Sequence, residues 1–120
     1  MQITVSLPFP PSLNRLWRAG KGKVYRSADY EAWRSESAWE ARRQAGTRKI
    51  AGQFRIIVNV VRPDKRHRDI DNLLKAVLDC LQHAGVIKND KNCEHIEIKW
   101  VDDGPPCEVI LEELTNGEEK

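Results

Sequence analysis

Two aspartates one residue apart stand in HRDIDNLLKAVLDCLQHAG, residues 67–85, where the hydrophobic pattern predicts the start of a helix. Residues i and i+2 point the same way in an extended chain, but about 200° apart in a helix. Asp69 and Asp71 therefore form a chelating pair only if Asp69 precedes the helix and Asp71 lies at about its N-cap. Mg²⁺ prefers such carboxylate oxygens, together with waters and phosphate oxygens.

A third carboxylate, Asp90, stands in VIKNDKN just after the helix, and Lys75 lies one helical turn beyond Asp71. A metal ion held by Asp69, Asp71 and Asp90 would generate hydroxide and stabilise charge at a reacting phosphate. Lys75 would meet the negative charge of the transition state or orient the attacking water. These four residues are the catalytic candidates, with Mg²⁺ as the expected cofactor and Mn²⁺ expected to replace it.

The same residues also fit roles without catalysis. A D-x-D at a helix start serves for capping and for interaction with the helix dipole, and Asp90 suits a turn. An EF-hand is excluded because the loop lacks its Gly at position six and its terminal Glu. A zinc site is conceivable but irregular in spacing, with the ligands Cys80, His83, Cys93 and His95.

Cations are concentrated before the acidic pair. Residues 1–68 hold 15 Lys/Arg against 5 Asp/Glu, whereas residues 69–120 hold 5 against 13. NRLWRAGKGKVYR, residues 14–26, interleaves cations with aromatic residues, which is typical of segments that grip phosphates and unstacked bases. RPDKRHR, residues 62–68, would hold a phosphodiester beside the metal. The alternatives are a solvated loop with its Trp in the core, and simple attraction between the two halves.

The elements needed to position these residues follow from the hydrophobic pattern. We expect one α+β domain over residues 1–120, a small mixed sheet of about four strands with two helices, in the order β-α-β-α-β-β. The strands are expected at 2–7, 53–61, 93–101 and 107–114, the helices at 27–45 and 71–84, and a long loop at 8–26. In the first helix Arg34, Arg42 and Arg43 are expected to face solvent.

Several protein classes are excluded by composition. The apolar runs are too short to span a bilayer, and the N-terminus does not have the pattern of a signal peptide, so a cytoplasmic protein is expected. The three cysteines, Cys80, Cys93 and Cys107, are odd in number and without a C-x-x-C pair, which favours reduced and mostly buried thiols.

Two motifs in this order resemble the RusA family of Holliday junction resolvases. LPFPPSLNRLWR resembles the family's opening strand and Pro-Pro-Ser-x-Asn-Arg loop. RPDKRHRDIDNLLKAVLDCLQHAGVIKND resembles its signature Pro-Asp-x-x-x-Arg-Asp-x-Asp-Asn-x-x-Lys, followed by a helix and a late Asp. The resemblance covers nearly the whole chain and implies a crossover junction endodeoxyribonuclease, often carried by prophages, that acts as a homodimer and nicks four-way DNA junctions symmetrically.

The resemblance also assigns roles. Asp69, Asp71 and Asp90 match the family's Mg²⁺-binding carboxylates, and Lys75 matches its essential lysine. The residues expected to contact DNA are Ser12, Asn14, Arg15, Arg18, Lys65, Arg66, Arg68 and Asn72. The alternatives in function are a non-catalytic DNA-binding phage accessory protein, and a nuclease for other branched or linear DNA.

Chain length bears on how the carboxylates meet. The helix from Asp71 to Gly85 spans about 21 Å, and the five residues from Gly85 to Asp90 reach back at most about 18 Å. We therefore expect Asp90 of one subunit to complete the Asp69/Asp71 pair of the other, in a two-fold homodimer with two shared sites.

Overall fold

The computed structural model describes residues 1–11, 17–20, 23–26 and 28–114, and only the backbone in the second and third of these ranges. Within these residues the elements are β1 (Gln2–Leu7), β2 (Trp17–Gly20), β3 (Lys23–Arg26), α1 (Ala28–Ala45), β4 (Phe54–Val61), η2 (Ile70–Leu73), α2 (Leu74–His83), η3 (Asp90–Asn92), β5 (Cys93–Val101) and β6 (Cys107–Glu113). The two segments labelled η are short 3₁₀ turns.

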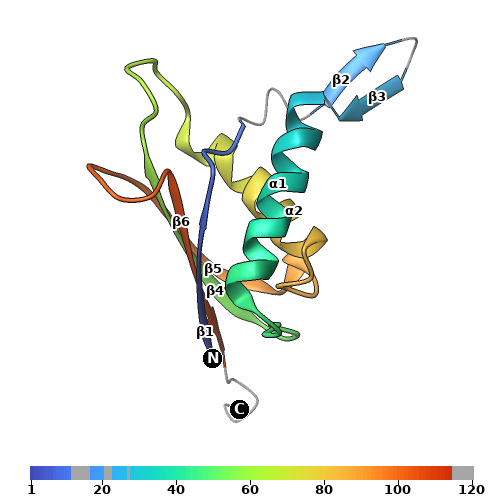
Figure 1. Cartoon of the computed structure of the whole chain (residues 1–120), viewed down its shortest axis with the longest axis vertical. Coiled ribbons are helices and arrows are strands. Elements are labelled where there is room, and N and C mark those ends of the chain that lie inside the picture. The colour runs from blue at the N-terminus through green and yellow to red at the C-terminus, as the bar shows by residue number, and fades with distance from the viewer. Residues whose placement is uncertain (12–16, 21–22, 27, 115–120) are drawn as a thin grey trace.

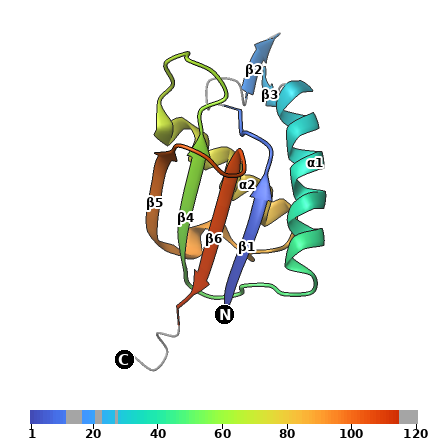
Figure 2. The same ribbon diagram turned by 60° about the vertical axis from the view of Figure 1, so that its left-hand side comes forward.

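Four strands form one mixed sheet in the order β1-β6-β4-β5. The crossover through α2 makes β5 parallel to β4, whereas β6 runs antiparallel to both β1 and β4. Both helices cover the same face of this sheet, which gives a two-layer fold (Figures 1 and 2). The expected α+β class, the four-stranded mixed sheet and the order of its strands and helices are confirmed.

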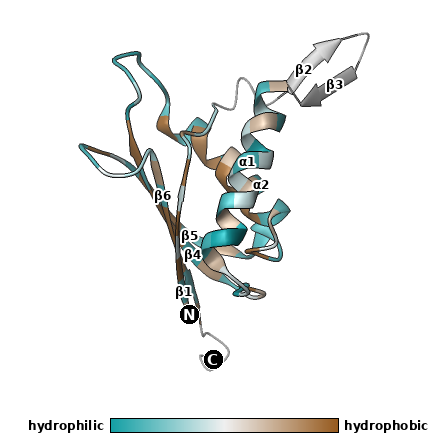
Figure 3. Cartoon of the chain, in the orientation of Figure 1, coloured by the Kyte–Doolittle hydropathy of each residue, from teal (hydrophilic) through white to brown (hydrophobic). Residues whose placement is uncertain are grey.

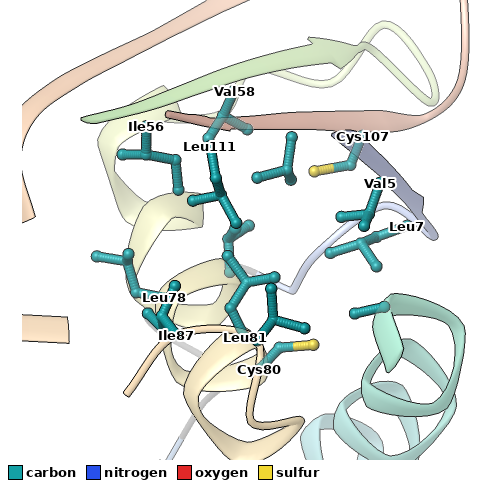
Figure 4. Packing of buried hydrophobic residues seen from close by; sticks show 14 of the residues in the cluster. Val5, Leu7, Ile56, Val58, Leu78, Cys80, Leu81, Ile87, Cys107 and Leu111 are labelled. Carbon is teal, nitrogen blue, oxygen red and sulfur yellow. The ribbon is translucent and has the colours of Figure 1, made fainter. Parts of the chain in front are cut away.

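The core lies between the sheet and the helices. Along β4 the side chains of Phe54, Ile56, Val58 and Val60 are buried and alternate with half-buried neighbours, as a strand covered on one face requires. Figure 4 shows Val58 and Leu111 of the sheet directed toward Leu81 of α2. Figure 3 shows hydrophobic residues along the strands and α2, and hydrophilic ones in the loop that follows β4.

The prediction of a long loop over residues 8–26 is wrong for its second half. β2 and β3 pair antiparallel, with Trp17 opposite Arg26 and Gly20 opposite Lys23. Two residues separate the strands, which is the commonest length of a hairpin connection. The glycines of this segment are typical of a loop, but glycine is also typical of hairpins.

The prediction that Arg34 faces solvent is also wrong. Its side chain is only 15% exposed, and its Nε lies 3.4 Å from Oδ2 of Asp79 on α2. Tyr30 donates a hydrogen bond to the same carboxylate, and a terminal nitrogen of Arg34 lies 2.8 Å from Nδ1 of His83. The two helices cover the sheet side by side, so their polar flanks face each other rather than water.

Arg42 likewise serves the packing of the helices. It donates hydrogen bonds of 3.0 and 3.2 Å to the carbonyl oxygen of Ala84, at the end of α2. The next residue, Gly85, has a φ of 79°, the left-handed conformation that commonly ends a helix. The sequence prediction of Gly85 as the residue that terminates this helix is confirmed.

Gly85→Ala is therefore expected to lower the free energy of unfolding by about 1 kcal/mol, because a Cβ is strained at this φ. The added Cβ would also meet the Arg42 guanidinium at 3.2 Å. Urea denaturation followed by circular dichroism measures the change. Gly52→Ala is the matched control, since its φ is not left-handed and its added Cβ meets no atom within 4 Å. An equal effect of both substitutions would contradict the role of Gly85.

Candidate metal and nucleic-acid site

A stack of aromatic rings and guanidinium groups holds the basic loop of residues 62–68. The guanidinium of Arg62 lies 4.3 Å from the ring centre of Trp100 on β5, and the Trp100 ring stacks on Phe9 at 6.3 Å. Arg68 lies over Phe9 at 5.4 Å. This cation–aromatic stack fixes both ends of the basic loop, because a guanidinium over an aromatic face is attracted to the ring electrostatically.

Asp64 forms hydrogen bonds to two other residues of the same basic loop. Its carboxylate accepts hydrogen bonds of 2.6 and 3.1 Å from the two terminal nitrogens of Arg68 and one of 2.9 Å from the backbone N–H of Arg66. The Arg68 guanidinium, then the Arg66 N–H, hold the pKa of Asp64 well below its usual range. The side chain of Arg68, which directly precedes Asp69, therefore has a fixed orientation.

Asp69 follows directly on this fixed arginine. Its backbone is extended, with φ −83° and ψ 118°, and it occupies the N-cap position of η2 without making a side-chain capping hydrogen bond. Asp71 lies inside η2, so the prediction that Asp71 is the N-cap is wrong by two residues. The helical segment begins as a 3₁₀ turn at Ile70, which the buried Leu73 and the partly buried Ile70 anchor against the core, and the α-helix itself begins only at Leu74.

Neither carboxylate of this pair makes a contact on which the fold depends. The side chain of Asp69 is 67% exposed, and its Oδ1 lies 3.9 Å from Nε2 of His67. Asp71 is exposed, and within the described residues its side chain makes no hydrogen bond. Capping therefore does not explain the doubled aspartate, and both carboxylates remain available to a ligand.

Asp90 is brought toward the start of α2. The side chain of Gln82 accepts a hydrogen bond of 2.9 Å from the Asp90 backbone N–H, and Asn89 forms an N-cap by accepting from the N–H of Lys91. One oxygen of Asp90 lies 3.7 Å from Nζ of Lys75, and these side chains are 26% and 58% exposed. Two of the four catalytic candidates are thus paired within one chain, and the expectation from chain length that Asp90 does not return toward the start of its own helix is wrong.

The three carboxylates do not form one group in a single chain. Across the described parts of the chain, no three His, Cys, Asp or Glu side chains are placed together so that they could hold a metal ion. This finding also covers the zinc alternative, whose four ligands are all described.

Cys80 and Cys107 are buried and free, and burial raises the pKa of each thiol to about 12, which keeps them protonated.

A cavity of about 340 Å³ lies beside the basic loop. Its lining joins the segment after β1, the start of α1 and the end of the loop: Phe9, Pro10, Pro11, Asp29, Trp33, Arg66, His67 and Arg68. Trp33 is anchored by a 3.1 Å hydrogen bond from its indole nitrogen to the carbonyl of Pro8. An apolar floor with a cationic wall is suited to sugar and phosphate groups of a nucleic acid.

Comparison with known proteins agrees with these motifs. The family described as "Endodeoxyribonuclease RusA" matches residues 8–112, a range that contains the loop, η2, α2 and Asp90. The chain belongs to the RusA family of endodeoxyribonucleases.

Three relatives show the extent of this similarity. The "Crossover junction endodeoxyribonuclease RusA" of Aquifex aeolicus (strain VF5) is 39% identical over 84 residues, 70% of this chain and 66% of the relative. That of Enterobacteria phage HK97 is 36% identical over 92 residues, 77% of each protein. That of Escherichia coli (strain K12) is 36% identical over 115 residues, 94% of this chain and 96% of the relative.

The structure places the RusA-like signature as follows. Lys65 and Arg66 are exposed on the basic loop, Arg68 is turned inward onto Asp64, and Asn72 lies in η2, where its backbone N–H donates to the carbonyl of Asp69. Of the first motif, Arg18 lies in β2, whose side chains are not described. The other predicted DNA contacts of that motif lie outside the described residues: Ser12, Asn14 and Arg15.

Sequence reasoning missed the residues that support this site. Arg62 and Asp64 stand inside the RPDKRHR motif, and Asp64 is the Asp of the Pro-Asp in the signature, but the sequence indicates no partner for either side chain. Trp100 lies on β5, far along the chain from the acidic pair, and no spacing in the sequence connects it to the loop. The partners of these residues are visible only in three dimensions.

The Asp64–Arg68 pair makes a titration prediction. Folding lowers the pKa of Asp64 below its ordinary value of 3.8, so the pair stabilises the loop above that pH and is lost only as pH falls through the lowered folded-state pKa. NMR titration of the Asp64 carboxyl carbon should therefore show no protonation between about pH 6 and pH 3.

Arg68→Ala should return the Asp64 pKa toward 3.8, because it removes the largest cause of the shift. Arg66→Ala is the matched control: it removes a cation 3.6 Å away but keeps the backbone N–H donor, so its effect should be smaller. Identical Asp64 titrations in the wild type and Arg68→Ala would contradict this account of the loop.

Proposed function

We propose that this chain is a single RusA-like endonuclease domain that resolves Holliday junctions by paired symmetric nicks. Its substrate would be four-way junction DNA, and its setting the cytoplasm of a bacterial or phage-infected cell. The family membership supports phosphodiester hydrolysis, and the names of the relatives support a crossover junction as the substrate. No helix among the described residues has the length and apolar character to cross a membrane.

The observation that carries the proposal is the position of Asp69. Its extended backbone directs it away from a helical environment, its side chain makes no cap, and it directly follows an arginine held by Asp64. Two exposed carboxylates next to a rigid cationic loop repel each other unless a cation lies between them. That arrangement fits a divalent metal with hard oxygen ligands, and we assign Asp69, Asp71 and Asp90 to it.

Mg²⁺ bound there would supply a Lewis acid and an activated water, and Mn²⁺ would substitute for it. The chain's own residues would bind the substrate and stabilise its charge. Lys65, Arg66 and Arg68 would hold the phosphodiester backbone, and Asn72 would donate to it beside the carboxylates. Lys75, already within 3.7 Å of Asp90, would leave this ion pair to meet the developing negative charge or to orient the attacking water.

The DNA-contacting role of the first motif rests on its sequence. Ser12, Asn14, Arg15 and Arg18 would grip phosphates from the segment that leads into and forms the β2–β3 hairpin. This hairpin projects from the same end of the molecule as the loop that follows β4 (Figure 1). The two basic segments would therefore engage one DNA molecule together.

Among the described residues no three potential ligand side chains are grouped so that they could hold a metal ion, which supports a homodimer with shared metal sites. In such a dimer Asp90 of one subunit joins Asp69 and Asp71 of the other. A two-fold arrangement supplies two equivalent sites, one for each of the two symmetric cuts.

Asp71→Asn should abolish nicking of a synthetic four-way junction in Mg²⁺ or Mn²⁺, with a loss of at least about a hundredfold, while junction binding in a metal-free buffer persists or tightens. The reason is that the substitution removes a metal ligand and also a charge that repels phosphate. Asp103→Asn, at an exposed turn position, is the control with the same chemical change. Nicking by Asp71→Asn at the wild-type rate would contradict the assignment of Asp71 as a metal ligand.

Mixing two inactive variants tests whether the site is shared. If Asp90 acts across the dimer, a mixed dimer of Asp71→Asn and Asp90→Asn has one site with both defects and one intact site. The mixture should then nick one strand of a junction, whereas each variant alone nicks neither. A mixture as inactive as its components, with subunit exchange shown by mass spectrometry of differently tagged chains, would place all three carboxylates in one subunit.

The same nicking assay distinguishes the alternative functions. Junction binding without cleavage in Mg²⁺ or Mn²⁺ would favour a non-catalytic DNA-binding accessory protein. Faster cleavage of flaps or linear duplex than of four-way junctions would favour a nuclease for other DNA.

A further inference from the structure

The cavity beside the basic loop is built from three segments that are distant in sequence. The segment after β1, the first turn of α1 and the end of the basic loop meet at the end of the molecule from which the β2–β3 hairpin projects (Figure 1). Its volume of about 340 Å³ lies within the range of cavities that hold small organic molecules. A phosphate group alone would fill only part of this space.

The floor of the cavity is apolar and is held in place by the fold. It consists of two aromatic rings and two proline rings: Phe9, Pro10, Pro11 and Trp33. The indole N–H of Trp33 already donates a hydrogen bond of 3.1 Å to the carbonyl of Pro8. The part of Trp33 that faces the cavity therefore offers apolar surface rather than a hydrogen-bond donor, and aromatic surface of this kind stacks on nucleobases.

The cations of the cavity come from the end of the basic loop. Arg66 and His67 are exposed, so both side chains can meet a phosphate that arrives from solvent. Arg68 lies deeper, where its guanidinium is held by Asp64 and adds positive charge to the wall. The cavity thus joins an apolar floor to a rim that attracts phosphate.

The cavity also contains a carboxylate, that of Asp29 in the first turn of α1. A carboxylate repels phosphate and accepts hydrogen bonds, so this residue does not suit a site for phosphate alone. Every DNA base has at least one N–H donor on its Watson–Crick edge, and enzymes that take a base out of the stack bind this edge by hydrogen bonds. Asp29 is suited to accept from such a donor in any base.

We propose that this cavity binds one unstacked nucleotide of a DNA strand. The base lies on the apolar floor, where Asp29 accepts from its free edge, and the phosphate lies at the rim against Arg66 and His67. The inference deepens the proposed function, and its DNA substrate rests on that function. It names the feature of branched DNA that the protein recognises.

The requirement for an unstacked base follows from the shape of the site. Neighbouring bases cover both faces of a base in a duplex, and its partner occupies the Watson–Crick edge. Removing a base from the stack costs free energy, and this cost is least for a base that is already unpaired. Stacking is interrupted at a branch point, so the cavity favours branched DNA over a continuous duplex.

His67 connects the cavity to the acidic pair. It lines the cavity, and its Nε2 lies 3.9 Å from Oδ1 of Asp69. A nucleotide with its phosphate at this rim places that phosphate beside a proposed metal ligand. Capture of the base would therefore position the strand for cleavage.

Removal of single bases tests the cavity in the absence of metal. Four-way junctions are prepared with one abasic residue, placed in turn at each nucleotide near the branch point, and their affinities for the wild type are measured in a metal-free buffer. At one position the loss of the base should weaken binding at least about fivefold, as expected for the loss of one stacked base. The other positions should show a smaller effect.

Filling the cavity should remove this dependence on the base. Asp29→Tyr introduces a large side chain from an exposed position of α1, so the ratio of the affinities for the intact and the abasic junction should fall to about one. This ratio is insensitive to the change in net charge, which affects both junctions equally. Glu36→Tyr is the matched control: it replaces an exposed acid two turns further along α1 and should keep the wild-type ratio. Circular dichroism establishes that each variant is folded.

Equal affinities of the wild type for the intact and every abasic junction, or no measurable binding, would overturn the proposal. So would a ratio that Asp29→Tyr leaves unchanged, or one that Glu36→Tyr lowers equally. The proposed function fails separately: a protein that binds junctions in this base-dependent way but does not nick them in Mg²⁺ or Mn²⁺ would retain the nucleotide site and lose the activity.

Discussion

The stack of Arg62, Trp100, Phe9 and Arg68 is the interaction on which the rest of the site depends. Its rings come from the segment after β1 and from β5, which are far apart in sequence and leave the sheet at the same end. Its cations come from the two ends of one loop. A loop held at both ends gives Asp69 a defined starting point, and the buried Leu73 then fixes η2 on the core. Rigid support of this kind lets exposed carboxylates keep a geometry that their own exposure would not maintain.

The charges around the proposed site are paired unevenly. Asp64 satisfies Arg68, and Lys75 satisfies Asp90, whereas Asp69 and Asp71 are left exposed with no cap. Bringing a third carboxylate to this pair without a cation would cost free energy through repulsion. A subunit whose Asp90 is held by Lys75 avoids this cost. In the proposed dimer, the site would assemble only when a second subunit, a metal ion and DNA are present together.

Much of the fold followed from hydrophobic pattern, because one buried face imposes period two on a strand and about 3.6 on a helix. β4, β5, β6 and the end of α2 at Gly85 were predictable in this way. The hairpin of β2 and β3 was not, since its glycines are equally typical of loops. Arg34 was misjudged for another reason: helical periodicity shows which face meets the core, but not that the flank of one helix will lie against Asp79 and His83 of the next.

The sequence by itself determined the chemistry of this protein: the kinds of residue, their order and the spacing that make Asp69, Asp71, Lys75 and Asp90 candidates for one site. Those features are local or are carried by motifs, so they can be read along the chain. Only the tertiary structure decided what each residue touches. It showed that Asp69 does not cap, that Asp64 orients Arg68, and that Gln44 hydrogen-bonds to the β1 edge of the sheet while β5 forms the other edge. Such facts depend on contacts between distant segments, and one-dimensional spacing carries no information about them.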